Sequence, residues 1–305
     1  MKSNLSFFLL ALVALVTITS CQKERTAPTS LLEDQFKDMT RHGGISGNIK
    51  IQAPSDWTVD YVKLENESLI LKDISDAEFR VINTDTVVAK NGWFRMAKSS
   101  HGDSLFIDLK ENFENVPRIL VIGLKANGKE EEMRITQHRG KSYKIIDKKI
   151  SEIDSLRRIY VSSHQCKPQT FSNYTSIPQK FSDRNVFWDV QHSSIFKSED
   201  YGAFLWMSER DSTLMMEDLI IDGTIVWTGR VSYRNGTSNT PYQRGAVIET
   251  QVNPNETITL NGEVKYVERT SHYVFTIQNE EAGNQFEITG TWKQTVPISS
   301  TLLRN

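Results

Sequence analysis

The chain has 305 residues, which at roughly 100–200 residues per domain suggests about two domains. Its 36 basic and 38 acidic residues are spread evenly, so the sequence offers no basic face for nucleic acid. A mean hydropathy of -0.42 with 10% aromatic residues excludes a polytopic membrane protein and a disordered chain, and two cysteines exclude a disulfide scaffold or a zinc ribbon.

Residues 1–20 have the features of a signal peptide. Lys2 precedes an apolar run from Phe7 to Ile18, which is too short for a bilayer span of roughly 20 apolar residues. The run leads into Thr17-Ile18-Thr19-Ser20-Cys21, which resembles the loose bacterial lipobox common in Bacteroidetes. That resemblance implies cleavage before Cys21, acylation of its thiol with palmitate-type chains, and a lipidated tether over residues 21–44. The alternatives are a signal-anchor helix and an ordinary secretory signal that ends near a cysteine.

The lipobox resemblance also predicts the location of the protein. Two or three acyl chains hold a protein on a membrane, so we expect a lipid-anchored protein of the bacterial cell envelope, on the outer membrane. In Bacteroidetes lipoproteins, acidic residues soon after the acylated cysteine mark export to the surface. Here Gln22-Lys23-Glu24-Arg25 has one acidic residue among basic ones, which leaves periplasmic and surface-facing orientations open.

Residues 45–138 alternate apolar and polar side chains in short runs, which predicts strands with one buried face. Asn127-Gly128 separates two such runs and predicts a type I′ hairpin turn. Seven short strands within about ninety residues favour an immunoglobulin-like β-sandwich. The buried tryptophans of this segment are expected to be Trp57 and Trp93.

Several motifs in this segment resemble the BACON domain family. They are a Trp, a Ser–Gly turn, an apolar strand, an Asn, an Arg that opens the next strand and a final Ile-Thr-Gln: Asn91-Gly92-Trp93, Ser100-His101-Gly102, Leu105–Leu109, Asn112, Pro117-Arg118 with Ile119–Ile122, and Arg134–Gln137. His101 departs from the family pattern. The resemblance implies an Ig-like fold and a surface lipoprotein in which this domain serves as a spacer, and the family name refers to carbohydrate binding.

Residues 139–184 are expected to be a linker with a helix over part of it. The prediction rests on apolar side chains near one helical face: Ile146, Ile150, Ile153, Leu156 and Tyr160. Residues 185–305 alternate again and predict a second antiparallel β-sandwich or open barrel of about eight strands. The expected strands include separate ones over 257–267, 272–278 and 285–293. The fold class is therefore all-β.

The sequence contains no motif for nucleotide binding, nucleophilic catalysis or a zinc protease. The six histidines are scattered singly, so we expect no metal site, no cofactor and no catalytic residues. Six carboxylates of the second domain are expected on the wet sides of strands: Glu217, Asp218, Asp222, Glu249, Glu263 and Glu287. Cys166 is expected to be a small buried residue, and the chain is expected not to be an enzyme.

Aromatic side chains are the better indication of binding, because sugar C–H faces stack on Trp and Tyr rings. Trp227 and Trp292 continue apolar faces and are expected in the core. Tyr201 and Tyr242 lie beside Gly, Asp or Pro in predicted loops and are the preferred exposed platforms. The predicted ligand-binding set is Tyr201, Tyr242, Trp206 and Trp188. Ordinary packing is the alternative for all four.

Together these features predict a non-enzymatic, lipid-anchored envelope protein, with a spacer domain and a binding domain whose ligand is a carbohydrate. One alternative is a structural or adhesion lipoprotein that joins envelope protein partners through exposed strands. A third hypothesis is an unrecognised glycan-processing enzyme. The expected partners are the membrane, through the lipid anchor, a glycan and envelope proteins, but no nucleic acid.

Overall fold

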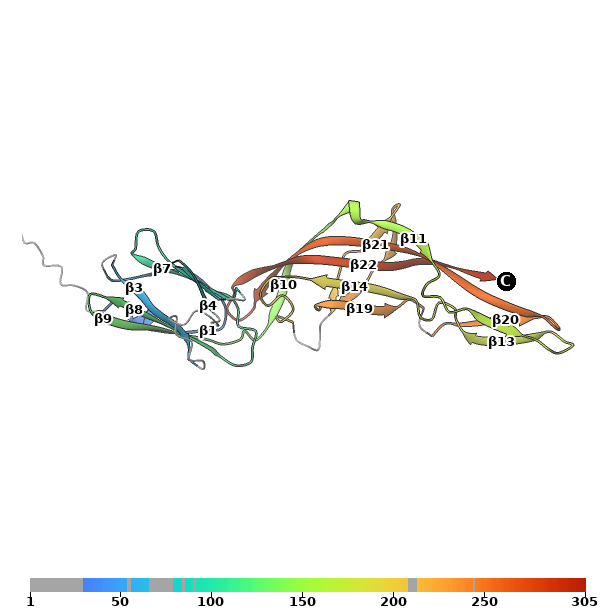
Figure 1. Ribbon diagram of the computed structural model, residues 1–305, viewed down its shortest axis with the longest axis horizontal. Coiled ribbons are helices and arrows are strands. Elements are labelled where there is room, and N and C mark those ends of the chain that lie inside the picture. The colour runs from blue at the N-terminus through green and yellow to red at the C-terminus, as the bar shows by residue number, and fades with distance from the viewer. Residues whose placement is uncertain are drawn as a thin grey trace, which may run out of the picture. The chain divides into compact units, whose positions relative to one another are not determined.

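A computed structural model describes residues 30–53, 56–65, 79–83, 86–89, 92–207, 213–243 and 245–305. The expected signal peptide and Cys21 lie outside the described residues. The described chain is all-β, as the alternating patterns predict, with antiparallel sheets and little helix (Figure 1). It forms two compact units. Of the described residues, unit 1 takes those from 30 to Arg41 and those within Ile45–Leu109 and Pro117–Gln137. Unit 2 takes His42–Gly44, Lys110–Val116 and the described residues of His138–Asn305.

Unit 1 is a sandwich of two sheets. The four-stranded sheet has the order β1-β9-β8-β3, and the five-stranded sheet has the order β2-β7-β6-β5-β4. A short helix, α2 (Asp34–Lys37), precedes the first strand. The strands are β1 (Asp38–Arg41), β2 (Ile45–Lys50), β3 (Thr58–Leu64), β4 (Phe79–Asn83), β5 (Thr86–Ala89), β6 (Phe94–Lys98), β7 (Ser104–Leu109), β8 (Arg118–Ala126) and β9 (Lys129–Gln137).

The core of unit 1 has the residues that the alternation predicts. Trp57 and Trp93 are buried, which confirms their expected place in the core. The Trp57 indole N–H donates a hydrogen bond of 2.7 Å to the carbonyl oxygen of Gly102, so burying the ring leaves no donor unpaired. The Arg118 guanidinium lies 4.1 Å from the centre of the Trp93 ring, where it covers the edge of the core.

Unit 2 is built on one long hairpin, β21 (Thr257–Asn279) and β22 (Gln285–Arg304). Its main sheet has the order β10-β21-β22-β14-β19, and β11 and β12 also pair with β21. These strands are β10 (Tyr143–Glu152), β11 (Arg158–Ser162), β12 (Gln169–Ser172), β14 (Gln191–Lys197) and β19 (Gly236–Pro241), with a 3₁₀ turn at Asp154–Leu156. Figure 1 shows β21 and β22 side by side along the unit.

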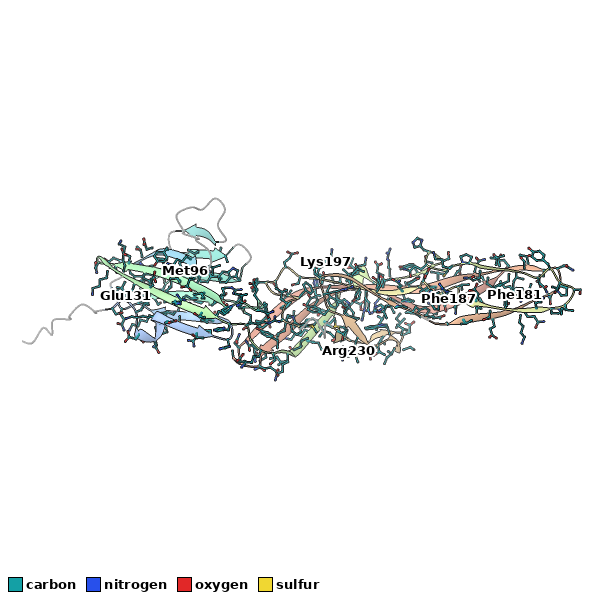
Figure 2. The ribbon with its side chains drawn as sticks, turned by 90° about the horizontal axis from the view of Figure 1, so that it is seen from below. Met96, Glu131, Phe181, Phe187, Lys197 and Arg230 are labelled. Atoms are coloured by element: carbon teal, nitrogen blue, oxygen red, sulfur yellow. The ribbon has the colours of Figure 1, made fainter. Side chains whose placement is uncertain are left out.

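Three two-stranded sheets complete unit 2. They pair β13 (Gln179–Arg184) with β20 (Val247–Val252), β15 (Thr213–Met215) with β18 (Arg230–Ser232), and β16 (Leu219–Ile221) with β17 (Thr224–Trp227). The β13–β20 pair covers a core that includes Phe171, Phe187 and Tyr266. Phe187, labelled in Figure 2, fills the space beside Gly262, where a Cβ would lie 2.5 Å from its ring. Gly262 therefore permits a close approach that a larger residue would block.

The predicted helix in 139–184 is wrong, because this segment supplies four strands of unit 2. Its longest strand is β10, which pairs with β21 from Tyr143↔Asn279 to Glu152↔Ser271. A bulge at Ile146 interrupts the pairing, so Ile145 and Ile150 both pack against the core although they are five residues apart. An extra residue in a strand shifts the alternation by one. This shift gave the apolar residues a spacing that resembles a helix.

The second correction concerns the two strands predicted over 257–267 and 272–278, which form one strand, β21. Tyr266 and Val267 are adjacent and both buried, so the core lies on one face of the strand before them and on the opposite face after them. Ile298 is the extra residue of β22 at this point, beside Pro297. Arg269 and Ser271 are buried but polar, which removes the apolar pattern just after the change of face.

Asn127 and Gly128 have φ angles of 49° and 76° between β8 and β9, which confirms the predicted type I′ turn. Gly128→Ala adds a Cβ where φ is positive, so we expect a loss of about 1 kcal/mol in the free energy of unfolding, measured by urea titration. Gly47→Ala on β2 is the control, because a Cβ there meets open space at ordinary φ. Equal effects of the two changes would contradict the explanation.

Candidate binding loop at residues 173–178

One loop of unit 2 presents an aromatic ring almost fully to solvent. Residues 173–178 connect β12, which pairs with the start of β21, to β13, which pairs with β20. The chain leaves β20 at Val252 and turns through 253–256 into β21, so a second turn lies beside the first. The backbone N–H of Asn173 donates to the carbonyl oxygen of Glu256 at 2.9 Å, which joins the two turns.

The Asn173 side chain fixes the shape of the loop. It is 1% exposed, and its amide group donates to the carbonyl oxygens of Ile177 at 2.8 Å and Val252 at 3.0 Å. Its carbonyl oxygen accepts from the N–H and the hydroxyl of Thr175, at 3.0 and 2.8 Å. A buried amide with both donors and its acceptor satisfied holds the backbone in one arrangement. The loop is therefore organised before any ligand arrives.

Tyr174 and Ile177 project from this fixed loop. Tyr174 is 86% exposed and Ile177 is 63% exposed. Neither 173–178 nor 253–255 contains a charged residue, and the neighbouring Glu256 carboxylate is paired with Arg304 at 3.6 Å. The result is a neutral surface with one free aromatic face and with amide and hydroxyl groups close by. Such a surface can stack on an apolar face of a ligand and hydrogen-bond to its polar groups.

The predicted aromatic platforms are placed differently. Trp206 is buried, and its indole N–H donates to the carbonyl oxygen of Ala203, so the expectation that it offers a face to a ligand is wrong. Tyr201 and Tyr242 are half-buried rather than exposed, against two different cores. Trp188 is also half-buried, with the Arg184 guanidinium 5.2 Å from its ring centre. The four residues thus form no common platform; ligand binding by Tyr201, Tyr242 and Trp188 stays a prediction.

Tyr174 is not among the predicted platforms, because it lies in the 139–184 segment, where the sequence pattern predicts only a linker. The turn was predictable in part, because an asparagine side chain often accepts the backbone N–H two residues on, as Asn173 does from Thr175. The second anchor, the carbonyl of Val252, lies 79 residues away in the chain. No local pattern reveals that contact.

The remaining chemical expectations concern carboxylates, thiols and histidines. All six carboxylates expected on wet strand sides are exposed, and Cys166 is buried, which raises the pKa of its thiol. The structure brings together two histidines that the sequence left apart, since the His42 and His138 rings stack at 5.0 Å within unit 2. Among the described residues no group of three or more His, Cys, Asp or Glu side chains could hold a metal ion.

Unit 1 carries a small hollow of about 150 Å³ lined by Tyr61 and four carboxylates, Asp60, Glu130, Glu131 and Glu132. Three of these carboxylates already have structural partners, and Glu132 is one of them, since it accepts from the Tyr61 hydroxyl and pairs with Lys63 at 3.6 Å. Glu131 accepts the backbone N–H groups of Leu31 and Leu32 at 2.9 and 3.0 Å, and Glu130 pairs with Lys125 at 2.6 Å. The hollow therefore belongs to the packing of the chain rather than to a catalytic arrangement. No helix in the described part of the chain is long and apolar enough to cross a membrane.

Comparisons with known proteins give no family. No family model and no curated protein matches the chain. The NMR structure of a protein from Bacteroides thetaiotaomicron is similar at 15% identity, over 38% of this chain and 84% of that one, with a TM-score of 0.28. The crystal structure of lamprey immune protein matches at 12% identity over 83% and 78%, with a TM-score of 0.33. The parasporin-2 toxin of Bacillus thuringiensis, described as recognising cancer cells, matches at 10% identity over 53% and 73%, with a TM-score of 0.28. Scores this low transfer neither fold family nor function to this chain.

Asn173→Ala removes four hydrogen bonds and leaves the carbonyl oxygens of Ile177 and Val252 without this donor. We expect a loss of about 2–3 kcal/mol in the free energy of unfolding, measured by urea titration. Asn253→Ala in the adjacent turn changes an exposed asparagine and is expected to cost less than about 0.5 kcal/mol. If the two variants are equally stable, Asn173 does not fix the loop.

Proposed function

We propose that this chain is a lipid-anchored protein of the bacterial cell envelope that binds a glycan through the 173–178 loop. The first half of the proposal is supported by the signal-like leader and by Cys21 at the end of a lipobox-like sequence. The second half is supported by one observation, the Tyr174 ring held 86% exposed on a loop that Asn173 fixes. The protein acts in this proposal as a non-enzymatic binding protein.

Unit 1 is the spacer in this proposal. Its motifs resemble the BACON family, and its two-sheet sandwich is compatible with that resemblance. A spacer needs a well-packed core but no cleft, and the buried tryptophans supply such a core. The role of unit 1 is then to hold unit 2 away from the outer membrane, with either face of that membrane allowed.

A glycan fits the loop better than a charged ligand does. The ring of a sugar has a C–H face that stacks on tyrosine, and its hydroxyl groups pair with neutral amides and hydroxyls. The loop offers Tyr174 for stacking and Thr175, Ser176 and Asn253 as polar neighbours, all exposed. A charged ligand would need an opposite charge at the loop, and 173–178 with 253–255 contains none.

A protein partner is the second candidate, and the edge of the main sheet supports it. β19 is the outer strand beyond β14, and four of its six residues are exposed. An outer strand can accept an added strand from another chain through backbone hydrogen bonds. Co-purified proteins that are lost when a proline replaces Thr237, and no retained glycan, would favour this function.

The glycan proposal is tested with the mature chain carrying Cys21→Ser, applied to an array of bacterial and host glycans. We expect specific retention, with Tyr174→Ala reducing affinity by about tenfold or more because stacking is lost, and Tyr174→Phe retaining most of it. Tyr160→Ala is the matched control, since that half-buried ring stacks on Tyr266 and belongs to no predicted binding set. Equal binding by wild type and Tyr174→Ala, or no retention by any variant, would refute glycan binding at this loop.

Lipid attachment has its own test in cells fed a labelled fatty acid. The wild-type chain is expected to take up the label, whereas Cys21→Ala should not because it lacks the acceptor thiol. The variant is also expected to keep its leader and therefore to run as a larger chain on a gel. A wild-type chain without label would end the lipoprotein half of the proposal and leave the loop untouched.

A further inference from the structure

The middle of the long hairpin in unit 2 buries a positive charge. Arg269 on β21 is 5% exposed, and its guanidinium lies 4.9 Å from the centre of the Trp292 ring. Its Nε donates to the side-chain oxygen of Gln294 at 2.8 Å. The nearest carboxylate, Glu152, is 3.7 Å away and is shared with Arg157. Burial lowers the pKa of Arg269, but an arginine keeps its charge, so the site holds an incompletely balanced cation.

A buried histidine depends on this arginine through Gln294. The Gln294 oxygen is committed to Arg269, so its amide nitrogen faces Nε2 of His192 at 2.9 Å and donates to it. A nitrogen that accepts a hydrogen bond carries no proton, which makes His192 the neutral tautomer with its proton on Nδ1. Burial and the charge of Arg269 lower the pKa of His192 to about 4.

The hairpin over residues 213–232 covers this network. Its strands β15–β18 and β16–β17 form sheets separate from the main sheet, so side chains attach it. The Trp227 ring lies 5.2 Å from that of His192, and Leu219 packs on Val267 and Val296. Two cations reach its backbone: Arg269 donates to the carbonyl oxygen of Glu217 at 3.3 Å, and Lys148 to that of Met215 at 2.6 Å.

We propose that the 213–232 hairpin is an acid-sensitive flap, and that protonation of His192 releases it from the long hairpin. A proton on Nε2 turns the acceptor of Gln294 into a second donor, so the hydrogen bond is lost. It also puts a second positive charge near that of Arg269, which repels it. If the Gln294 amide rotated so that its oxygen accepted from the imidazolium, it would lose its hydrogen bond from the Arg269 guanidinium.

The groups around His192 do not supply a compensating carboxylate. Around His192 and Gln294, β21 supplies Arg269 and β22 supplies Trp292. The flap supplies Trp227 and the Glu217 carbonyl, and β19 supplies Thr240, which is the strand partner of His192. Glu152 and Arg157 lie beside Arg269. Two carboxylates act on Arg269: Glu152, which is bound to Arg157 at 2.5 Å, and Glu217 of the flap. The charge that acts on His192 itself is that of Arg269.

Release would expose an apolar surface that the closed flap hides. The flap buries Leu219 against Val267 and Val296. Its Met216 and Val231 are buried in the neighbouring core with Tyr233 and Trp292, so release would uncover part of that core as well. The outer face already exposes Met215, Ile220 and Ile225. A two-stranded hairpin is marginally stable alone, so the released flap would fray and its backbone amides would exchange with solvent. The structure thus contains a surface for apolar contacts that is available in acid and covered at neutral pH. This inference is independent of the glycan loop.

The sign of the effect follows from the two protonation equilibria. In the released state His192 titrates near its ordinary value of about 6.5, whereas in the closed state it binds a proton only near 4. The closed state is therefore fully favoured above about pH 6.5 and loses stability as the pH falls toward 4. The equilibrium constant for release should rise by up to about two orders of magnitude over that interval.

Hydrogen exchange measured by mass spectrometry on the whole mature chain tests the flap. After correction for the intrinsic pH dependence of exchange, protection of peptides from 213–232 should fall between pH 7 and pH 4.5, while that of β21 and β22 is retained. His192→Gln keeps an acceptor but cannot take up the proton, so its flap should stay protected at both pH values. His272→Gln, an exposed histidine on β21, is the matched control and should open like the wild type.

Loss of protection throughout unit 2 in acid, or an unchanged flap in the wild type, would overturn the proposal, as would opening of His192→Gln. If His192→Gln does not fold, NMR titration of the wild-type imidazole replaces it. The pH midpoint of flap opening must then coincide with the pH midpoint of His192 protonation. A midpoint that coincides with the titration of other groups refutes the proposal.

Discussion

The pairing of β21 with β22 is the interaction on which the second unit depends. It runs from Leu260↔Arg304 to Gln278↔Gln285 and is interrupted only by the bulge at Ile298. Strands β10, β11 and β12 pair with successive parts of β21. The backbone hydrogen bonds need no particular side chain, so pairing continues through the section where Arg269, Ser271 and Gln294 replace apolar residues. Both the candidate binding loop and the flap are attached to this one frame.

Sequence alone predicted unit 1 well, because strands such as β5, β7 and β9 alternate in a simple way and Asn127-Gly128 specifies its own turn. It predicted unit 2 poorly at two places with identifiable causes. The bulge at Ile146 shifted the alternation of β10 toward a helical spacing, and the buried polar residues after Val267 looked like a gap between strands. In each case the deciding partner lies more than a hundred residues away or on the opposite strand, which a local pattern cannot show.

The candidate site shows the same division. The sequence predicts aromatic rings as ligand-binding groups, but the exposure of each ring depends on which residues cover it in the folded chain. Ala203 and the surrounding core take up Trp206, whereas nothing in 173–178 folds over Tyr174. Its exposure is maintained by Asn173, whose partner Val252 comes from another strand. The network beneath the flap could not be predicted from the sequence either, since it joins three strands through His192, Arg269 and Gln294.

The change of buried face at Tyr266 also divides unit 2 energetically. Phe171, Phe187 and their neighbours pack on one side of the long strand, and Tyr273, Phe275 and Trp292 on the other, with only two continuous strands shared between them. Cores linked by so little common surface act as separate cooperative blocks. A substitution in one block would then lower the local stability of that end while the other keeps its own, so this single polypeptide unit behaves as two semi-autonomous modules on a common spine.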